Sequence, residues 1–503
     1  MISLLNPQDT KKSSTISRTT ANVLDFEDYI SVFQDGFFNH ALRLLGQERI
    51  FRYLGVYPNE GLPNSLLTIR NQLAGQTPPI HRIPVEILGE IFTHYTYSVR
   101  HVEDKIPLLS AGPACDGNPF ILGQVCGLWR HIVLAMPTLW QSLCVDSPTP
   151  GSVHLVELWL QRARECPLTI QLFENFDSPR HAREVMHAII LLVIRRIRQW
   201  KHISFRISRY HQHILATLPA GHAMSLQYAE VDTSSWNYHN GDSMWRALHS
   251  SPALTYVEWG HVYREIDRMP DHIPWAQLTR INLSMTPNDV STLHVLKKCK
   301  NLTVLEIWGL SSSSASPHDS PLALPNLRTL YIRSHDDPGH FLQGLVLPNL
   351  ISLSINHSSG GPGIIPHRDS RSFRIFLEQS KCCLERFNFT DGDIDENNLM
   401  EYLSCPSLTS LNELRIRATL TDLTISSLTI VKETCQLLPN LKTIDFSVCR
   451  TTPGTFSDMV ASRLPSLECV DVSFCPKFND HIHDRTILRV IRQSSNINIA
   501  RGL

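Results

Sequence analysis

Leu327-Arg328-Thr329-Leu330-Tyr331-Ile332 and Leu350-Ile351-Ser352-Leu353-Ser354-Ile355 share the pattern Leu-x-x-φ-x-φ, in which φ is an apolar residue. Apolar side chains that alternate with polar ones predict a short β-strand with one buried face. The pattern occurs nine times, with leading leucines at positions 254, 278, 302, 327, 350, 384, 411, 441 and 467. Weaker copies precede these nine, at Ile203, Phe205 and Ile207 and at Leu226 and Val231.

The spacing of these units predicts the fold class. Successive leading leucines are 23 to 34 residues apart, whereas a leucine-rich repeat has about 20–29 residues, so the longer units contain insertions. Each unit supplies one strand, and its return segment covers one side of the sheet. We therefore expect residues 146–503 to form an irregular α/β solenoid, a curved parallel sheet with helices on its convex side. Prolines just before several strands, such as Pro325 and Pro348, end the preceding segment and set the turn.

Two amphipathic segments precede the repeats. The first is Pro84-Val85-Glu86-Ile87-Leu88-Gly89-Glu90-Ile91-Phe92, and the second is Val125-Cys126-Gly127-Leu128-Trp129-Arg130. In both, apolar residues recur every three or four positions, which places them on one face of a helix. Such stripes are also usual in the core of ordinary helical units. Periodicity alone therefore leaves both a core role and a docking role open.

The residues themselves resemble the F-box, a helical module that binds a Skp-type adaptor and through it a cullin scaffold in a ubiquitin ligase. The resemblance implies a small all-α domain over residues 80–145. It also implies an adaptor-binding surface, with Trp129 as its anchor because large aromatic side chains dominate interface energetics. The residues of this expected surface are Pro84, Ile87, Leu88, Ile91, Phe92, Val125, Cys126 and Trp129.

One stretch departs from the compact F-box pattern. Residues 93–124 are longer than the usual linker and rich in proline and glycine, so we interpret them as a loop insertion, which surface loops tolerate. Three further runs are similar to the fungal, mushroom-type branch of F-box proteins. They are Pro137-Thr138-Leu139-Trp140, Leu158-Trp159-Leu160 and Cys166-Pro167-Leu168. Cys449 and Cys475, each eight residues after a leading leucine, resemble a cysteine-containing repeat subtype often joined to F-boxes.

Composition fits an interaction protein of the cytoplasm or nucleus. The 503-residue chain has a formal net charge of −1, so bulk electrostatics favours neither nucleic acid nor an anionic membrane as a partner. Its twelve cysteines are scattered, which favours reduced thiols. No apolar run is long enough to span a bilayer. Residues 1–24 are polar and predicted to be disordered, and residues 25–79 have helical patterning of unknown role.

Motifs for catalysis or metal binding are weak. The acidic run from Asp391 to Glu396 lacks the glycine and the final glutamate of a calcium loop, so Asp395 is better explained as a helix N-cap. The histidine pairs at 211/213 and 481/483 have no third ligand at a suitable spacing. Phosphate-loop and nucleophile-elbow motifs are absent from the sequence. We expect no cofactor and no catalytic residue.

The expected function is that of a substrate-recognition subunit of an SCF-type ubiquitin ligase. The helices would bind the adaptor, and outward residues of the repeat strands, such as Glu306, Tyr331 and Ser354, would contact a target protein. Two alternatives stay open. One is an F-box scaffold that acts outside a ligase, and the other is a repeat-only interaction or sensor protein. The sequence does not identify the target.

Overall fold

The computed structural model describes residues 83–97, 118–175, 179–259, 263, 265–283, 287–312, 320–357, 369–431, 437–464, 466–474 and 497–501. Residues Ile83–Leu503 form one compact unit. The predicted tail (1–24) and helical segment (25–79) lie outside the described residues, as do Cys475 and the histidines at 481 and 483.

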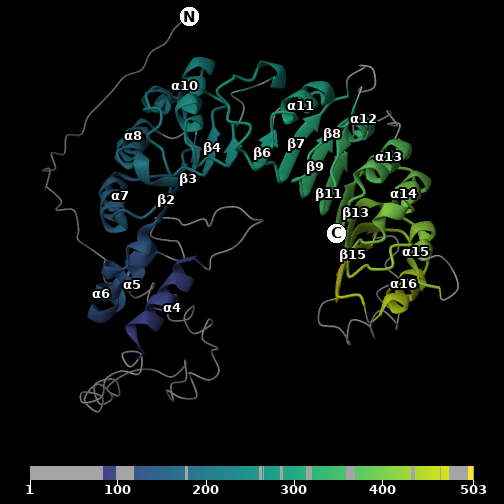
Figure 1. Cartoon of the computed structure of the whole chain (residues 1–503). Helices are drawn as coiled ribbons and strands as arrows, with labels where there is room; N and C mark the ends of the chain where they lie inside the picture. Colours follow the sequence, from purple (N-terminus) through teal and green to yellow (C-terminus); the bar gives the residue numbers. More distant parts are fainter. Residues whose placement is uncertain are drawn as a thin grey trace, which may run out of the picture. The chain divides into compact units, whose positions relative to one another are not determined.

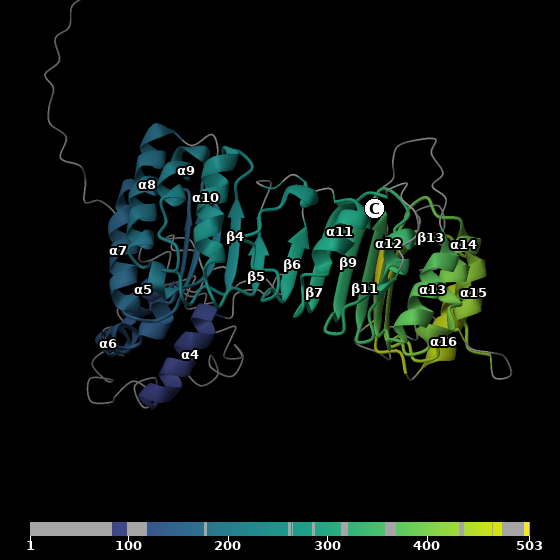
Figure 2. The same cartoon turned by 45° about the horizontal axis from the view of Figure 1, so that its top comes forward.

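A parallel sheet of 14 strands dominates the unit. Its neighbouring strands all pair in the same direction, as β4 to β7 do in Figure 2. The strands, in spatial order, are β1 (Ser142–Asp146), β2 (Leu168–Phe173), β3 (Trp200–Arg206), β4 (Tyr228–Asp232), β5 (Tyr256–Glu258), β6 (Arg280–Leu283), β7 (Val304–Leu310), β9 (Thr329–Ser334), β11 (Ser352–His357), β12 (Arg386–Thr390), β13 (Glu413–Leu420), β14 (Thr443–Cys449), β15 (Cys469–Phe474) and β16 (Ile497–Arg501). Two short strands, β8 (Leu322–Ala323) and β10 (Leu345–Val346), pair separately.

Helices connect the strands and lie on one side of the sheet (Figure 1). They are α7 (Pro150–Ala163), α8 (Arg180–Ile194), α9 (Gln212–Ala216), α10 (Tyr238–His249), α11 (Asp289–Leu296), α12 (Gly339–Gln343), α13 (Ser370–Ser380), α14 (Glu396–Leu403), α15 (Asp422–Leu428) and α16 (Thr455–Arg463). Short 3-10 turns lie at Ile197–Gln199, Arg209–His211, Ile266–Arg268 and Pro406–Leu408. We call the opposite side, formed by the alternate strand residues, the open face.

The repeat pattern predicts these strands correctly. All nine units fall on strands, from β5 to β15, and both weaker copies also do so, on β3 and β4. The nine leading leucines are buried, together with the two apolar residues that follow each of them. Burying a leucine side chain contributes about 1.5–3 kcal/mol, so each unit adds a similar increment to the core. The mixed α/β class with a large parallel sheet is therefore confirmed.

The sheet begins earlier than the sequence pattern indicates. Strand β1 begins at Ser142, inside the range 80–145 that was predicted to be helical, and β2 follows it before the first weak repeat. Helices also extend into the predicted 93–124 loop, because α4 (Val85–Tyr97) and α5 (Pro119–Val125) cover both of its ends. Residues 98–117 lie outside the described residues. The helical segment and the sheet are thus parts of one compact unit.

Polar residues just before the leading leucines connect neighbouring repeats. The Nδ2 of Asn301, Asn326 and Asn349 donates to a backbone oxygen of the preceding repeat, at 2.8, 3.1 and 2.8 Å respectively. Asn440 makes the same kind of bond to the Thr409 oxygen at 2.7 Å. The segments just before these strands therefore supply, besides their prolines, a row of asparagines along the sheet. We call this row the asparagine ladder, and it satisfies carbonyls that the strands leave unpaired.

A chain of buried and partly buried hydrogen bonds crosses the repeats around α10. Trp259 Nε1 donates to His249 Nε2 at 2.9 Å, so the proton of neutral His249 lies on Nδ1, which is 2.9 Å from His272 Nδ1. His272 Nε2 then bonds Asp242 at 3.1 Å, and Tyr263 donates to the same carboxylate at 3.0 Å. Burial, followed by the repulsion of His272, lowers the pKa of His249 well below its usual value. Since Nδ1 of His249 donates, His272 accepts on Nδ1 and donates from Nε2 to Asp242, so each of these hydrogen bonds has a defined donor.

This arrangement predicts that the protein loses stability on acidification. Because its pKa is lower in the folded state, His249 takes up a proton in the unfolded chain first, so stability falls as pH drops below about 6.5. Burial and the charge of Lys201 lower the pKa of His202 to about 4, which acts in the same direction.

Urea unfolding between pH 7.5 and 5 should show this decline in stability. His249→Gln should be less stable at pH 7.5 and should show a shallower slope. An equal slope in the two proteins would contradict the assignment.

The remaining sequence motifs have structural roles. Cys449 is buried at the end of β14, where burial raises the pKa of its thiol to about 12. Asp395 is the N-cap of α14 as predicted, since its side chain accepts from Asn397 N at 3.1 Å. His211 pairs with the buried Glu174 carboxylate at 3.1 Å. Within the described ranges, no helix is both long enough and apolar enough to cross a membrane.

Candidate protein-binding surfaces

The helical segment ahead of the sheet is built around aromatic contacts. It comprises α4, α5, α6 (Gly127–Ala135) and a 3-10 turn at Pro137–Trp140. Phe92 of α4 and Trp129 of α6 lie with ring centroids 4.7 Å apart. Trp140 stacks edge-on against Trp159 of α7 at 5.1 Å, and its Nε1 donates to the Val133 oxygen at 3.0 Å. The aromatic runs at 137–140 and 158–160 therefore join this segment to the start of the repeats.

The eight residues expected to bind an adaptor lie in different environments, some buried and some exposed. Leu88 and Phe92 are fully buried and Trp129 is buried as well, so these three side chains pack inside the segment. Cys126 is the N-cap of α6, where its Sγ accepts from Trp129 N at 3.5 Å. Pro84 is exposed and directly precedes α4.

The other three residues form an exposed apolar set, which we call the helix patch. Ile87 and Ile91 are one turn apart on α4 and are 51% and 38% exposed. Val125, at the end of α5, is 47% exposed. Exposed aliphatic side chains are ordinary when they are scattered singly, but Ile87 and Ile91 are neighbours on one helix face, and grouped apolar side chains indicate an interaction surface.

The three residues expected to contact a target lie side by side on the open face. Glu306 on β7 is in register with Tyr331 on β9, and Tyr331 is in register with Ser354 on β11. The Glu306 carboxylate accepts from Arg280 Nη2 at 2.6 Å. Asn356 Nδ2 lies 3.5 Å from the Tyr331 hydroxyl. The structure thus brings together three positions that are 25 and 23 residues apart in sequence.

Trp308 belongs to this group and was missed by the sequence interpretation. It is 36% exposed and lies 4.9 Å from the Tyr331 ring, with the Arg333 guanidinium 5.9 Å from its own ring centroid. Gly309 follows with φ +90°, and the register of β7 against β9 shifts there, which is typical of a bulge that needs glycine. Strand alternation provides the missed signal, because Trp308 is two residues beyond Glu306 and shares its face.

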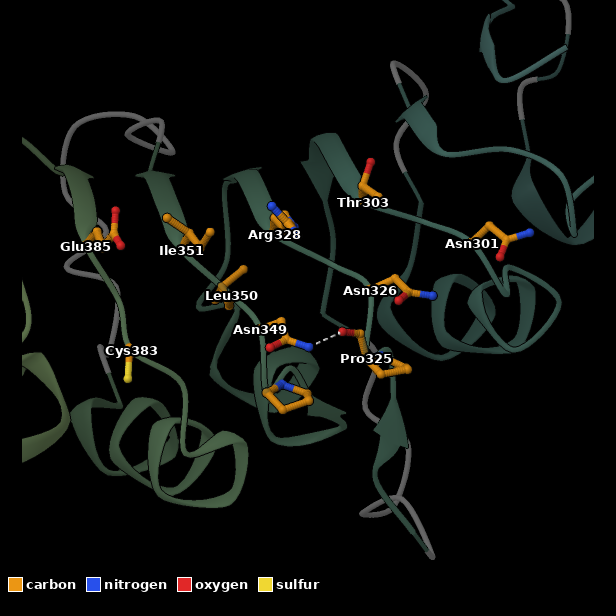
Figure 3. Close-up of a pocket in the computed structure, with 11 residues that line it drawn as sticks. Asn301, Thr303, Pro325, Asn326, Arg328, Asn349, Leu350, Ile351, Cys383 and Glu385 are labelled. Atoms are coloured by element: carbon orange, nitrogen blue, oxygen red, sulfur yellow. Dashed lines mark hydrogen bonds between the residues drawn. The ribbon is translucent and has the colours of Figure 1, made fainter. Parts of the chain in front are cut away.

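A groove of about 640 Å³ lies where strands β7, β9, β11 and β12 begin (Figure 3). Asn301, Asn326 and Asn349 of the asparagine ladder are part of its lining, together with Pro325, whose backbone oxygen accepts the bond from Asn349. Arg328 and Glu385 are the charged residues of its lining. The groove has structural hydrogen bonds and no assembled catalytic set.

Metal binding has no support among the described residues, where no group of three or more histidine, cysteine or acidic side chains is placed to hold an ion. The 391–396 run ends in capping contacts. Glu396 accepts from Thr424 N at 3.1 Å and Thr424 Oγ1 at 2.6 Å, and from Thr421 N at 2.8 Å. These hydrogen bonds outweigh partial burial and lower the pKa of the Glu396 carboxyl.

Comparison with known proteins identifies no family. No family model matches the sequence, and no curated protein matches it. Among solved structures, the chain is similar to a crystal structure of a protein from Bacteroides fragilis, with 18% sequence identity and a TM-score of 0.34. The match covers 59% of this chain and 84% of that chain. A likeness of this size assigns neither a family nor a function.

Proposed function

We propose that the chain is the substrate-recognition subunit of an SCF-type ubiquitin ligase. In this proposal, the helical segment binds a Skp-type adaptor through the helix patch, and the open face of the sheet binds a target protein. Other subunits carry out the ubiquitin chemistry. The chain holds target lysines near the conjugating enzyme and thereby raises their effective concentration. It therefore has no catalytic residue of its own and works in the cytoplasm or nucleus.

One observation carries the proposal. The segment whose residues resemble an F-box leaves Ile87, Ile91 and Val125 exposed, and it is followed by a sheet whose open face presents Trp308 and Tyr331. Exposed apolar side chains on helices and aromatic side chains on a rigid sheet are both favourable anchors for protein partners. Two separate surfaces of this kind fit a molecule that connects two proteins.

The helix patch can be tested without disturbing the fold. Replacing the exposed pair, Ile87→Asp with Ile91→Asp, should weaken binding of a purified Skp-type adaptor by at least about 100-fold, because each charge would have to be desolvated in the interface. The unfolding temperature should change little. A matched control is Leu191→Asp, an equally exposed leucine on α8 at 42%, which should leave adaptor binding unchanged. Equal losses in both proteins would argue against the helix patch.

Co-purification of partners with the chain separates the ligase from its main alternative. If the adaptor co-purifies together with a cullin, the chain belongs to a ligase. If the adaptor co-purifies without a cullin, the chain is a scaffold outside a ligase. If no adaptor co-purifies, the chain is better explained as a repeat-only interaction protein.

A further inference from the structure

A row of hydrogen-bond acceptors crosses the N-terminal half of the open face. Neighbouring strands align these side chains in register from β2 to β5 and again from β6 to β7. We call them the acceptor row, which consists of Gln171, Ser204, Glu230, Glu258, Asn282 and Glu306.

The centre of the acceptor row places two like charges opposite each other. Glu230 on β4 is in register with Glu258 on β5, and neighbouring strands are only about 4.8 Å apart. Like charges directly opposite each other destabilise a sheet. Within the described ranges, no lysine or arginine forms an ion pair with Glu230.

Tyrosines hold both carboxylates in place. The hydroxyl of Tyr228 donates to Glu230 at 3.1 Å, and that of Tyr256 donates to Glu258 at 2.8 Å. The two tyrosine rings stack with centroids 4.2 Å apart. Burial, followed by the charges of Glu230 and Glu258, raises the pKa of Tyr228. The pair of charges is thus fixed on a rigid aromatic base.

A second, independent observation points to a donor that is missing from the row. Asn282 is 8% exposed, and its Nδ2 lies 3.4 Å from Glu306, which directs the side chain along the row. Its Oδ1 has no hydrogen-bond partner. The Gln171 Oε1 at the other end of the row, in a side chain 5% exposed, also lacks one. Buried acceptors without a partner are costly, so each favours a ligand that brings N–H groups.

We propose that the acceptor row binds an extended protein segment that carries lysine or arginine side chains. Ammonium and guanidinium groups supply only donors and positive charge, and they complement both the carboxylates and the unpaired amide oxygens. Exposed Trp308, near the Glu306 end of the row, offers an apolar contact to the same segment. The inference deepens the proposed function, since it names the chemistry of the target that the open face would select.

The test uses the whole chain and three labelled peptides of alternating sequence, Thr-Lys, Thr-Gln and Thr-Glu. Fluorescence anisotropy should show that the Thr-Lys peptide binds at least about tenfold more tightly than the Thr-Gln peptide, and that added salt weakens this binding. The Thr-Glu peptide should not bind. Glu230→Gln with Glu258→Gln should remove the preference for lysine and leave the unfolding temperature unchanged or higher.

Two further proteins make the test specific. Glu157→Gln with Glu378→Gln changes the net charge equally, but on exposed positions of α7 and α13, and should bind the Thr-Lys peptide like the wild type. Glu258→Lys places a cation opposite Glu230 and should abolish Thr-Lys binding in a stably folded protein.

Several results would overturn the proposal. These are equal binding of the Thr-Lys and Thr-Glu peptides, full Thr-Lys binding by the row variants, or self-association of the chain that the row variants abolish. The last result would assign the row to a second copy. Adaptor binding should be unaffected by the row variants, and the Ile87→Asp/Ile91→Asp protein should keep Thr-Lys binding, so failure of one proposal does not imply failure of the other.

Discussion

Arg463→Met is expected to destabilise the C-terminal repeats by about 3 kcal/mol. Arg463 lies on α16, is 1% exposed, and donates to three backbone oxygens. Its Nε bonds Leu428 O at 2.7 Å, Nη1 bonds Leu438 O at 2.8 Å, and Nη2 bonds Leu437 O at 2.8 Å. Methionine has a similar length but donates nothing, so three carbonyls would lose their partner. Leaving a buried acceptor unpaired costs about 1–3 kcal/mol each, partly offset here by no longer burying a charge.

Hydrogen exchange is the appropriate measurement, because repeat proteins lose stability locally. Amides of β14 and β15 should exchange faster in Arg463→Met, and those of β5 to β7 should not change. Arg463→Lys keeps the charge without the planar fork of donors, and its loss should be intermediate. Burial lowers the pKa of Arg463 to about 10, so the side chain stays charged at neutral pH. Unchanged exchange in β14 and β15 would contradict this role.

Trp129→Ala is expected to cost about 3–5 kcal/mol in the helical segment, the usual range for deleting a buried aromatic side chain. Trp129 fills the space between α4 and α6 and contacts Phe92 at 4.7 Å. The variant should therefore lose protection of the α4 amides and, as a consequence, adaptor binding. Trp129→Phe leaves an aromatic ring in the same position and should lose less of both.

Comparison with the surface variants makes this prediction informative. In Trp129→Ala, loss of binding should accompany loss of local structure. In Ile87→Asp/Ile91→Asp, binding should be lost while the structure is retained. If Trp129→Ala kept normal exchange in α4 and still lost the adaptor, then Trp129 would touch the partner directly, as the sequence alone suggests.

The strands of the repeat sheet could be predicted from the sequence because burial is local in that pattern. Each leading leucine and the two apolar residues after it alternate at the period of a strand, so their inward direction follows from the backbone. Strand β2 has the same alternation of apolar residues, but it does not belong to one of the nine repeat units. Its alternating Leu168, Ile170 and Leu172 are all buried and could have identified it.

The candidate binding surfaces were harder to predict, for a geometric reason. Helical periodicity places Ile87, Leu88, Ile91 and Phe92 in one stripe, but it does not say which edge of the stripe packs inside. In the structure, Leu88 and Phe92 are buried and the other two are exposed, because Trp129 of α6 packs against the Phe92 side of α4. Contacts of this kind depend on chain segments that are distant in sequence.

The same reason applies to buried polar groups. In the sequence, Arg463 resembles any basic residue at the end of a helix. The three backbone oxygens that accept its hydrogen bonds lie 25 to 35 positions away in the chain. The acceptor row is likewise visible only once neighbouring strands are in register, since Glu230 and Glu258 lie 28 residues apart. The positions of the strands could be predicted from sequence patterns, whereas the open-face surfaces depend on the register between neighbouring strands.

Isothermal titration calorimetry of a purified Skp-type adaptor with the whole chain measures the proposed interaction itself. We expect one-to-one binding with a dissociation constant of about 1 μM or tighter, as is usual for a specific protein interface. Binding should be lost in Ile87→Asp/Ile91→Asp and kept in Leu191→Asp. No measurable binding by the folded wild-type chain, or equal binding by all three proteins, would contradict it.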